Sequence, residues 1–165
     1  MRYPSGALIP LKPGGLLLSS PAFAQGNTIP VRYTCDGKDL SPALSWDAVP
    51  EVTSYALIME DPDAPLGTFT HWVLYNIPPE RQSLPEGLPA QETLPGIGVQ
   101  GRNDFGRFGY GGPCPPPGPP HRYRFILYGL NLPATLPKGL DRTSLLRAIK
   151  DRILFSATLE GQYGR

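Results

Sequence analysis

His71-Trp-Val-Leu-Tyr-Asn-Ile77 is an apolar run that ends at two prolines, which predicts a buried β-strand. A second such run, Tyr123-Arg-Phe-Ile-Leu-Tyr-Gly-Leu130, follows a segment rich in glycine and proline. The chain has two histidines, and both lie where a loop enters one of these runs, at His71 and His121. Because loops at strand ends build sites on a rigid sheet, both histidines are candidates for a functional site.

Shorter apolar runs predict further strands at residues 15–19, 45–46, 55–59 and 155–161. One helix is predicted near the C-terminus, behind capping residues at 141–144. Its apolar residues recur at helical spacing: Leu145, Leu146, Ile149 and Ile153. We therefore predict one domain over residues 1–165 with a mainly β fold, a β-sandwich with a C-terminal helix packed at one end.

Composition limits the classes of partner. Hydrophobic residues make up 40% of the 165 residues, but no apolar run is long enough to span a membrane, so no stable membrane insertion is expected. The net charge of +1 gives no field that would attract nucleic acid. Ala22-Phe-Ala24 has the form of a signal-peptidase site, but no apolar segment of sufficient length precedes it. We expect a cytoplasmic protein.

The residues near the histidines suggest an anion site. Asp61 or Asp63 can accept a hydrogen bond from an imidazole and fix its tautomer. His121 and Tyr123 have the same parity on a strand and face the same side. In the glycine-rich segment 109–118, successive amides can form an anion-binding nest.

We predict that a phosphate-like or carboxylate anion binds between His71, His121 and the amides of Gly111 and Gly112. We also predict that Asp61 raises the pKa of a pocket histidine by pairing with its imidazolium.

Other chemistries are less well supported. Two histidines and a carboxylate could bind iron or zinc, but no metal-ligand spacing is present, and no serine or cysteine nucleophile stands beside a base. Residues 96–101 match the G-x-G-x-x-G dinucleotide fingerprint without its strand and helix, which predicts a flexible loop. We therefore expect no cofactor, no metal and no catalytic residue. Cys35 and Cys114 are either free thiols or a disulfide.

Asp61-Pro-Asp-Ala-Pro65, His71-Trp72 and Pro120-His-Arg-Tyr123 together resemble the phosphatidylethanolamine-binding protein family. Further segments resemble its bacterial and archaeal Raf-kinase-inhibitor-like branch: Thr34-Cys-Asp-Gly37, Ser41-Pro-Ala-Leu-Ser-Trp46, Asn103-Asp-Phe-Gly106 and Tyr163-Gly-Arg165. The resemblance implies a β-sandwich with a small anion pocket at one end, and it places both cysteine loops toward that end.

The resemblance also implies which residues form the pocket. The residues that match its interior are Asp61, His71, His121 and Tyr123, and those that match its rim are Pro65, Gly112 and Pro113. The chain departs from the mammalian pattern at Thr70, where those members carry another histidine, and we expect no counterpart of their C-terminal covering helix. These departures weaken the case for lipid headgroup binding and kinase regulation.

We predict a non-enzymatic protein that binds a small anion through this pocket. One alternative is an inhibitor or regulator of a partner protease or kinase. A second is a hydrolase that uses the histidine pair, with or without a metal. A homodimer is left open.

Overall fold

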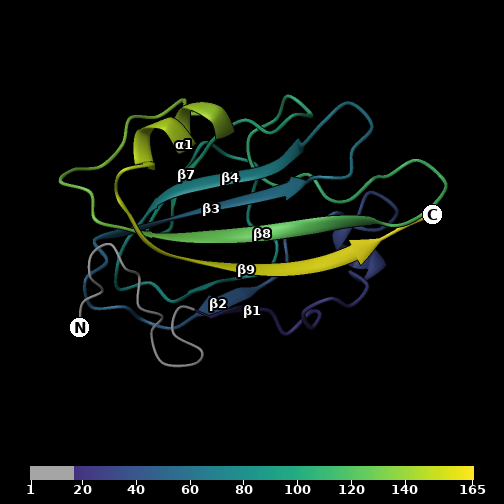
Figure 1. Cartoon of the computed structure of the whole chain (residues 1–165), viewed down its shortest axis with the longest axis horizontal. Coiled ribbons are helices and arrows are strands. Elements are labelled where there is room, and N and C mark those ends of the chain that lie inside the picture. Colours follow the sequence, from purple (N-terminus) through teal and green to yellow (C-terminus); the bar gives the residue numbers. More distant parts are fainter. Residues whose placement is uncertain (1–16) are drawn as a thin grey trace.

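A six-stranded antiparallel sheet forms the centre of the molecule in this computed structural model, which describes residues 17–165 (Figure 1). The strand order is β6-β7-β4-β3-β8-β9. In chain order the strands are β3 (Ser54–Asp61), β4 (Phe69–Ile77), β6 (Thr93–Leu94), β7 (Gly98–Gln100), β8 (His121–Leu130) and β9 (Ile153–Tyr163). β3 lies in the interior of the sheet between β4 and β8.

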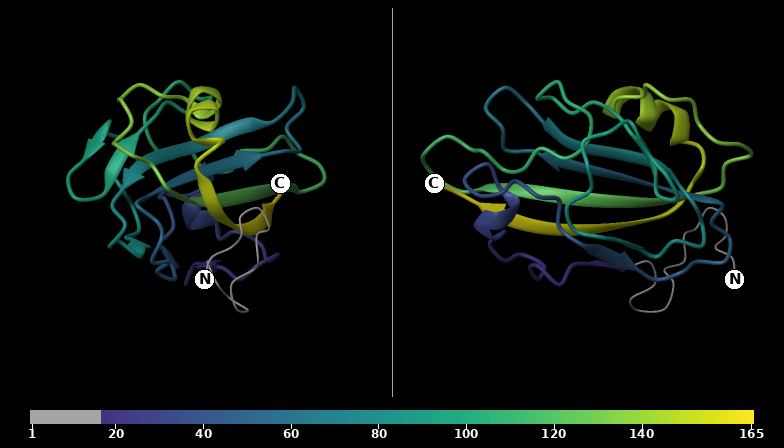
Figure 2. Two further views of the ribbon diagram at one scale, coloured as in Figure 1. Left: turned by 60° about the vertical axis from the view of Figure 1, so that its left-hand side comes forward. Right: turned by 180° about the vertical axis from the view of Figure 1, so that it is seen from behind.

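A smaller sheet of three strands packs against one face of the large sheet, which gives the β-sandwich (Figure 2). Its strands are β1 (Leu18–Ser19), β2 (Leu44–Trp46) and β5 (Ser83–Leu84), and a 3-10 turn, η1 (Val31–Tyr33), lies between β1 and β2. Side chains alternate across a strand, so Tyr123, Phe125 and Leu127 of β8 all face this core and are fully buried.

The helix α1 (Arg142–Ile149) covers the other face of the large sheet. Leu145 and Ile149 are buried there among apolar residues of β3, β4 and β8. The helix begins at a capping box, in which the Asp141 carboxylate accepts from the Ser144 amide and the Ser144 hydroxyl lies 3.0 Å from the Asp141 amide. Because both faces of the large sheet are covered, β3 is almost entirely buried.

A β-bulge in β4 sets the direction of His71. Met59 pairs with Trp72, but the next residue of β3, Glu60, pairs with Thr70, so His71 is an extra residue in β4. Opposed residues face the same side of a sheet. Thr70 therefore faces α1 together with Glu60, which bonds Arg142, while His71 is turned toward Tyr123 on the sandwich face.

The predicted fold class is confirmed, with two local corrections. The expected helix is one turn too long, because Ile153 begins β9 and a turn at residues 150–152 ends the helix. Residues 96–101 are not a flexible loop, because β6 and β7 pair there as a hairpin at the sheet edge. Residues 15–16 of the predicted first strand lie outside the described residues.

Cys35 and Cys114 form a disulfide, so the alternative of two free thiols is wrong.

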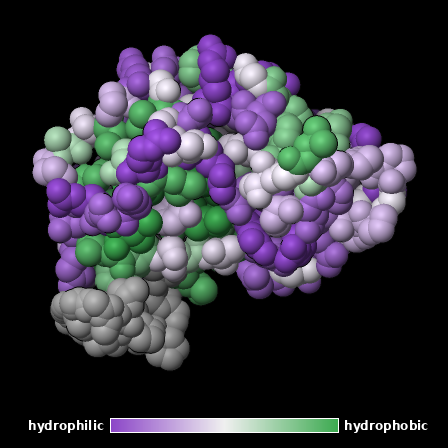
Figure 3. Space-filling model, turned by 45° about the horizontal axis from the view of Figure 1, so that its top comes forward, coloured by the Kyte–Doolittle hydropathy of each residue, from purple (hydrophilic) through white to green (hydrophobic). Residues whose placement is uncertain are grey.

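Across residues 17–165, no helix has the length and apolar character needed to cross a membrane. Figure 3 shows the molecule turned so that the side of α1 comes forward, and hydrophilic and hydrophobic residues are interspersed on this face.

Candidate functional site

A small pocket lies where the end of β3 meets the starts of β4 and β8. Its volume is about 200 Å³. Its lining combines four polar side chains with apolar walls: Asp61, Ala64, Pro65, Phe69, His71, Phe105, Cys114, Pro115, Pro116, His121 and Tyr123. The four interior residues named from the sequence, Asp61, His71, His121 and Tyr123, and the rim residue Pro65 are all in this pocket.

Asp61 holds His121 in one orientation. The Asp61 Oδ2 atom lies 2.7 Å from the Nδ1 atom of His121, and the other carboxylate oxygen accepts from the Asp63 amide at 2.8 Å. Asp61 is 4% exposed, so its charge requires these partners. Because a carboxylate accepts, Nδ1 of His121 carries a proton, and the Nε2 atom is left as the second polar atom of the ring.

His71 is held by a backbone carbonyl instead. Its Nδ1 atom lies 2.6 Å from the Gly111 oxygen, and a carbonyl can only accept, so Nδ1–H donates and Nε2 is left. The ring is 3% exposed, and its edge contacts with Phe69, Phe105 and Tyr123 bring the centroids to 5.0–5.3 Å. Burial lowers the pKa of His71, against smaller opposing effects from the Gly111 carbonyl and Asp61.

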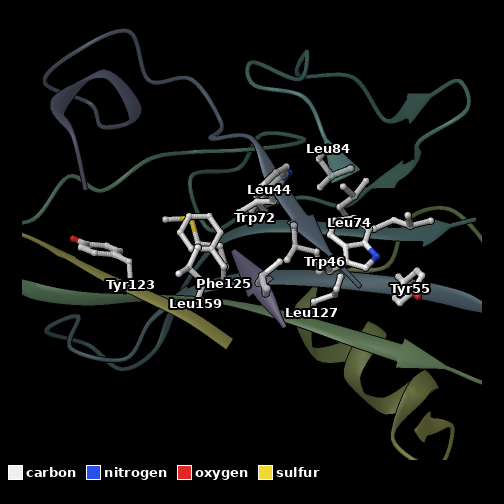
Figure 4. Close-up of a cluster of buried hydrophobic side chains, with 14 of the residues drawn as sticks. Leu44, Trp46, Tyr55, Trp72, Leu74, Leu84, Tyr123, Phe125, Leu127 and Leu159 are labelled. Carbon is white, nitrogen blue, oxygen red and sulfur yellow. The ribbon is translucent and has the colours of Figure 1, made fainter. Parts of the chain in front are cut away.

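Tyr123 lies at the end of the core cluster, with its hydroxyl directed away from Phe125 and Leu159 (Figure 4). The side chain is fully buried, yet its hydroxyl has no hydrogen-bond partner among the described residues. Burial, and then the negative charge of Asp61 and a hydrogen-bonding interaction with its carboxylate, raise the pKa of Tyr123 far enough to keep the phenol protonated. Because no acceptor within residues 17–165 lies in regular hydrogen-bond geometry, the pocket contains a donor whose bonding capacity is not filled.

A family model described as "Phosphatidylethanolamine-binding protein" matches residues 19–164. The chain belongs to the phosphatidylethanolamine-binding protein family. Among its curated relatives, a UPF0098 protein of Methanothermobacter thermautotrophicus is 49% identical over 149 residues, which cover 90% of this chain and 98% of the relative. A UPF0098 protein of Aquifex aeolicus is 48% identical over 157 residues, which cover 92% and 91%.

Solved structures of the family have the same fold. A phosphatidylethanolamine-binding protein homologue from Chlamydia trachomatis superposes with a TM-score of 0.82 and 38% identity, over 92% of this chain and 99% of the homologue. E. coli YbcL, described as a new member of the mammalian family, also has a TM-score of 0.82, with 31% identity over 91% and 98% of the two chains.

In this family member, the amides of Gly111 and Gly112 do not point into the pocket as free donors. The Gly111 amide donates to the His71 carbonyl at 2.9 Å, and the Gly112 amide donates to Asp39 at 2.8 Å. The predicted anion nest is therefore wrong. The pocket lining also does not include Gly111, Gly112 or Pro113. This segment contributes to the pocket indirectly, because the Gly111 carbonyl accepts the hydrogen bond that orients His71.

The predicted pairing with Asp61 does not involve His71, whose Nδ1 atom is hydrogen-bonded to Gly111 and whose pKa is lowered by burial against the opposing charge of Asp61. Asp61 does act as an acceptor that fixes an imidazole, as predicted, and its partner is His121. Asp63 has a different role, because it accepts from the backbone and the guanidinium of Arg122. These hydrogen bonds lower the pKa of Asp63 to about 2.

Two aromatic walls were not predicted. Phe69 and Phe105 meet edge to face at 4.8 Å and enclose His71. Asn103 positions Phe105, because its side-chain oxygen accepts from the amides of Phe105 and Arg107. The Asn103-Asp-Phe-Gly106 segment was noted as a family feature, but nothing in its sequence places it beside His71. No three histidine, cysteine, aspartate or glutamate side chains within residues 17–165 are grouped as metal ligands would be.

The neutral, buried His71 should make the protein less stable in mild acid. A base whose folded pKa lies below its unfolded value binds fewer protons when folded, so stability falls as the pH drops below about 6.5 and levels off below the lowered pKa. His71→Gln keeps a donor for the Gly111 carbonyl and should remove this slope. Urea denaturation at a series of pH values measures it.

The carboxylates cause a separate loss of folding stability at lower pH. Asp63, Asp36 and Asp141 have lowered pKa values, so their contribution is lost below a pH of about 4. Parallel stability profiles for the wild type and His71→Gln between pH values of about 6.5 and 4.5 would contradict the assignment to His71.

Proposed function

We propose that this chain is a non-enzymatic binding protein whose pocket holds a phosphate-like or carboxylate group. The observation that carries this proposal is the buried Tyr123 hydroxyl, which lacks a partner and lines the pocket. A buried polar group without a hydrogen bond costs about 1–3 kcal/mol. A ligand oxygen that accepts from this hydroxyl would remove that cost.

The two histidines complete the donor set when they are protonated. Both Nδ1 atoms are already bonded, to Gly111 and Asp61, so a ligand can use only the Nε2 atoms. A neutral imidazole presents a lone pair at Nε2 and repels an oxyanion, whereas an imidazolium presents N–H there. The proposed site therefore takes up protons as it binds the anion. In the charged pair, His121 also neutralises Asp61.

The size and walls of the pocket favour a small group. A volume of about 200 Å³ is below the usual range of about 300–1,000 Å³ for drug-sized ligands. Phe69, Phe105 and the prolines 115 and 116 surround the polar atoms with apolar walls, and an apolar surrounding strengthens each hydrogen bond. The family takes its name from phosphatidylethanolamine, whose headgroup contains a phosphoryl group, and such a group belongs to the proposed ligand class.

We infer that the pocket has no catalytic role. Its lining includes no serine or threonine, and the sulfur of Cys114 is committed to the disulfide. A hydrolase would need a nucleophile or an activated water. A protein partner, such as a protease or kinase, and a cytoplasmic location stay predictions.

Tyr123→Phe should weaken sulfate binding by about tenfold or more, because a hydrogen bond to a charged group contributes about 1.5–3 kcal/mol. The same change should leave folding stability equal or higher, because the hydroxyl has no partner in the ligand-free fold. Isothermal titration calorimetry and urea denaturation measure the two effects. Tyr128→Phe, on the opposite face of β8, is the control. Equal sulfate affinity in Tyr123→Phe and wild type would contradict the site.

Sulfate affinity should rise as the pH is lowered from about 8 to about 5, because the Nε2 atoms become donors as the imidazoles gain protons. Sulfate stays fully ionised over this range, so the change reports on the protein alone. Calorimetry in two buffers with different ionisation enthalpies counts the protons taken up. Acetate in place of sulfate distinguishes a carboxylate site from a phosphate-like one. A sulfate affinity independent of pH would exclude the histidines as donors.

The purified protein should hydrolyse phosphomonoester, phosphodiester and ester substrates no faster than the buffer does. Chromogenic substrates of each class measure this. One substrate whose hydrolysis disappears in both His71→Ala and His121→Ala would establish the hydrolase alternative.

A further inference from the structure

The Cys35–Cys114 disulfide forms part of the pocket wall and is open to solvent. Cys114 lines the pocket together with Pro115 and Pro116, and it is exposed, whereas Cys35 is half-buried. Both cysteines lie at the end of the molecule where the C-terminal residues lie beside η1 (Figure 1). An external thiol can therefore approach Cys114 without unfolding of the chain.

A guanidinium group contacts both sulfur atoms. The Nη2 atom of Arg165 is 3.2 Å from the Cys35 Sγ atom and 3.6 Å from that of Cys114. Asp36 holds this arginine through two hydrogen bonds, and Asp36 also accepts from the hydroxyl of Tyr163. A positive charge beside a sulfur atom stabilises its thiolate and makes it a better leaving group. The shorter contact marks Cys35 as the sulfur that leaves.

Few backbone hydrogen bonds hold the part of the pocket wall around Cys114. Six of the eight residues from 113 to 120 are prolines, which have no backbone N–H to donate. Before Cys114, the Pro113 carbonyl accepts from the Cys35 amide at 3.1 Å. After it, the one amide of residues 115–120 is that of Gly118, which donates to the Arg165 carbonyl at a long 3.3 Å. Apart from the packing of the buried Pro115, the disulfide is thus the main link between this wall and the segment of Cys35.

We propose that the Cys35–Cys114 disulfide is a thiol-exchange site whose substrate is an external dithiol, and that its reduction opens the pocket wall. A thiolate of the dithiol attacks the Cys114 Sγ atom. The disulfide breaks, and its electron pair leaves on the Cys35 Sγ atom beside Arg165. The second thiolate of the reagent then attacks the reagent sulfur atom that is bonded to Cys114. This closes the reagent into a cyclic disulfide and releases the Cys114 thiolate. The dithiol is oxidised, two electrons enter the protein, and solvent supplies the protons.

Opening the wall should lower anion affinity, and this consequence rests on the proposed function. Cys114, Pro115 and Pro116 help to exclude water from the donors of the pocket. Once the sulfur atoms separate, no cross-link holds these residues to the segment of Cys35. The redox state of the surroundings would then set how tightly the pocket holds its ligand.

The first test measures the rate at which dithiothreitol reduces the folded protein, by thiol titration after acid quenching. Reduction should proceed without unfolding, so its rate should be nearly independent of low urea concentrations. Arg165→Gln should slow it by about threefold or more, because the leaving thiolate loses its charged partner. Arg124→Gln changes the net charge equally but removes an arginine paired with Glu160, and it should have no effect.

A second variant excludes an effect of the carboxylate that Arg165→Gln leaves unpaired. The double variant Arg165→Gln with Asp36→Asn removes both charges and should be slow as well. A wild-type rate in this variant would overturn the role of Arg165. A reduction rate that rises with urea by the full equilibrium m-value would show that reduction requires unfolding and would overturn the exchange site.

The last test locates the attack and measures its consequence. Glutathione, a monothiol, should be trapped on Cys114, as mapped by mass spectrometry; a mixed disulfide found on Cys35 alone would refute the assigned order. The reduced protein and Cys35→Ser/Cys114→Ser should bind sulfate more weakly than the oxidised protein, and equal affinities would overturn the link to the wall. If the oxidised protein binds no sulfate, the proposed anion site fails, and the rates still decide the exchange site.

Discussion

The buried Asp61 carboxylate is the constraint on which the pocket depends. A charge taken out of water has to be matched, and Asp61 is matched by an imidazole from the start of β8 and by a backbone amide of its own turn. These contacts join the end of β3 to the strand beside it. Asp63 makes a second connection between this turn and β8, because it accepts a hydrogen bond from the guanidinium of Arg122. The corner that begins at Asp61 is therefore joined twice to the start of β8, and the histidine it positions is fixed with it.

His71 reaches the same pocket by a different route. Regular alternation would have directed it toward the layer of α1, and the bulge in β4 reverses this. The Nδ1–H group of His71 donates a hydrogen bond to the carbonyl of Gly111 in the glycine-rich segment. The amide of Gly111 in turn donates to the His71 carbonyl and holds this segment in place. The end of β3 supplies a charged acceptor and the glycine-rich segment a neutral one, so the two imidazoles have the same tautomer but different surroundings. Their common property is an Nε2 atom with no role in maintaining the fold.

Sequence patterns were sufficient for the longer strands, the capped helix and the two histidines, because periodicity and loop placement are local properties. They did not predict the short strand β5, and only the family resemblance distinguished Asp61 from Asp63. They failed where a partner distant in the sequence decides the outcome. The glycine amides looked free, but their acceptors, the His71 carbonyl and Asp39, are 40 and 73 residues away. Ile153 fitted the helical spacing, but pairing with Leu130 makes it part of a strand. The wall formed by Phe105 depends on loop packing that no short motif encodes.

Tyr123 belongs to two structures at once: its ring closes the hydrophobic core, and its hydroxyl forms the floor of the pocket. The sandwich is thus assembled without a regular hydrogen bond for this hydroxyl, and a molecule from outside can supply it. A bound ligand would in this sense become a structural component of the interior, and the free energy of its binding would add to the stability of the folded state.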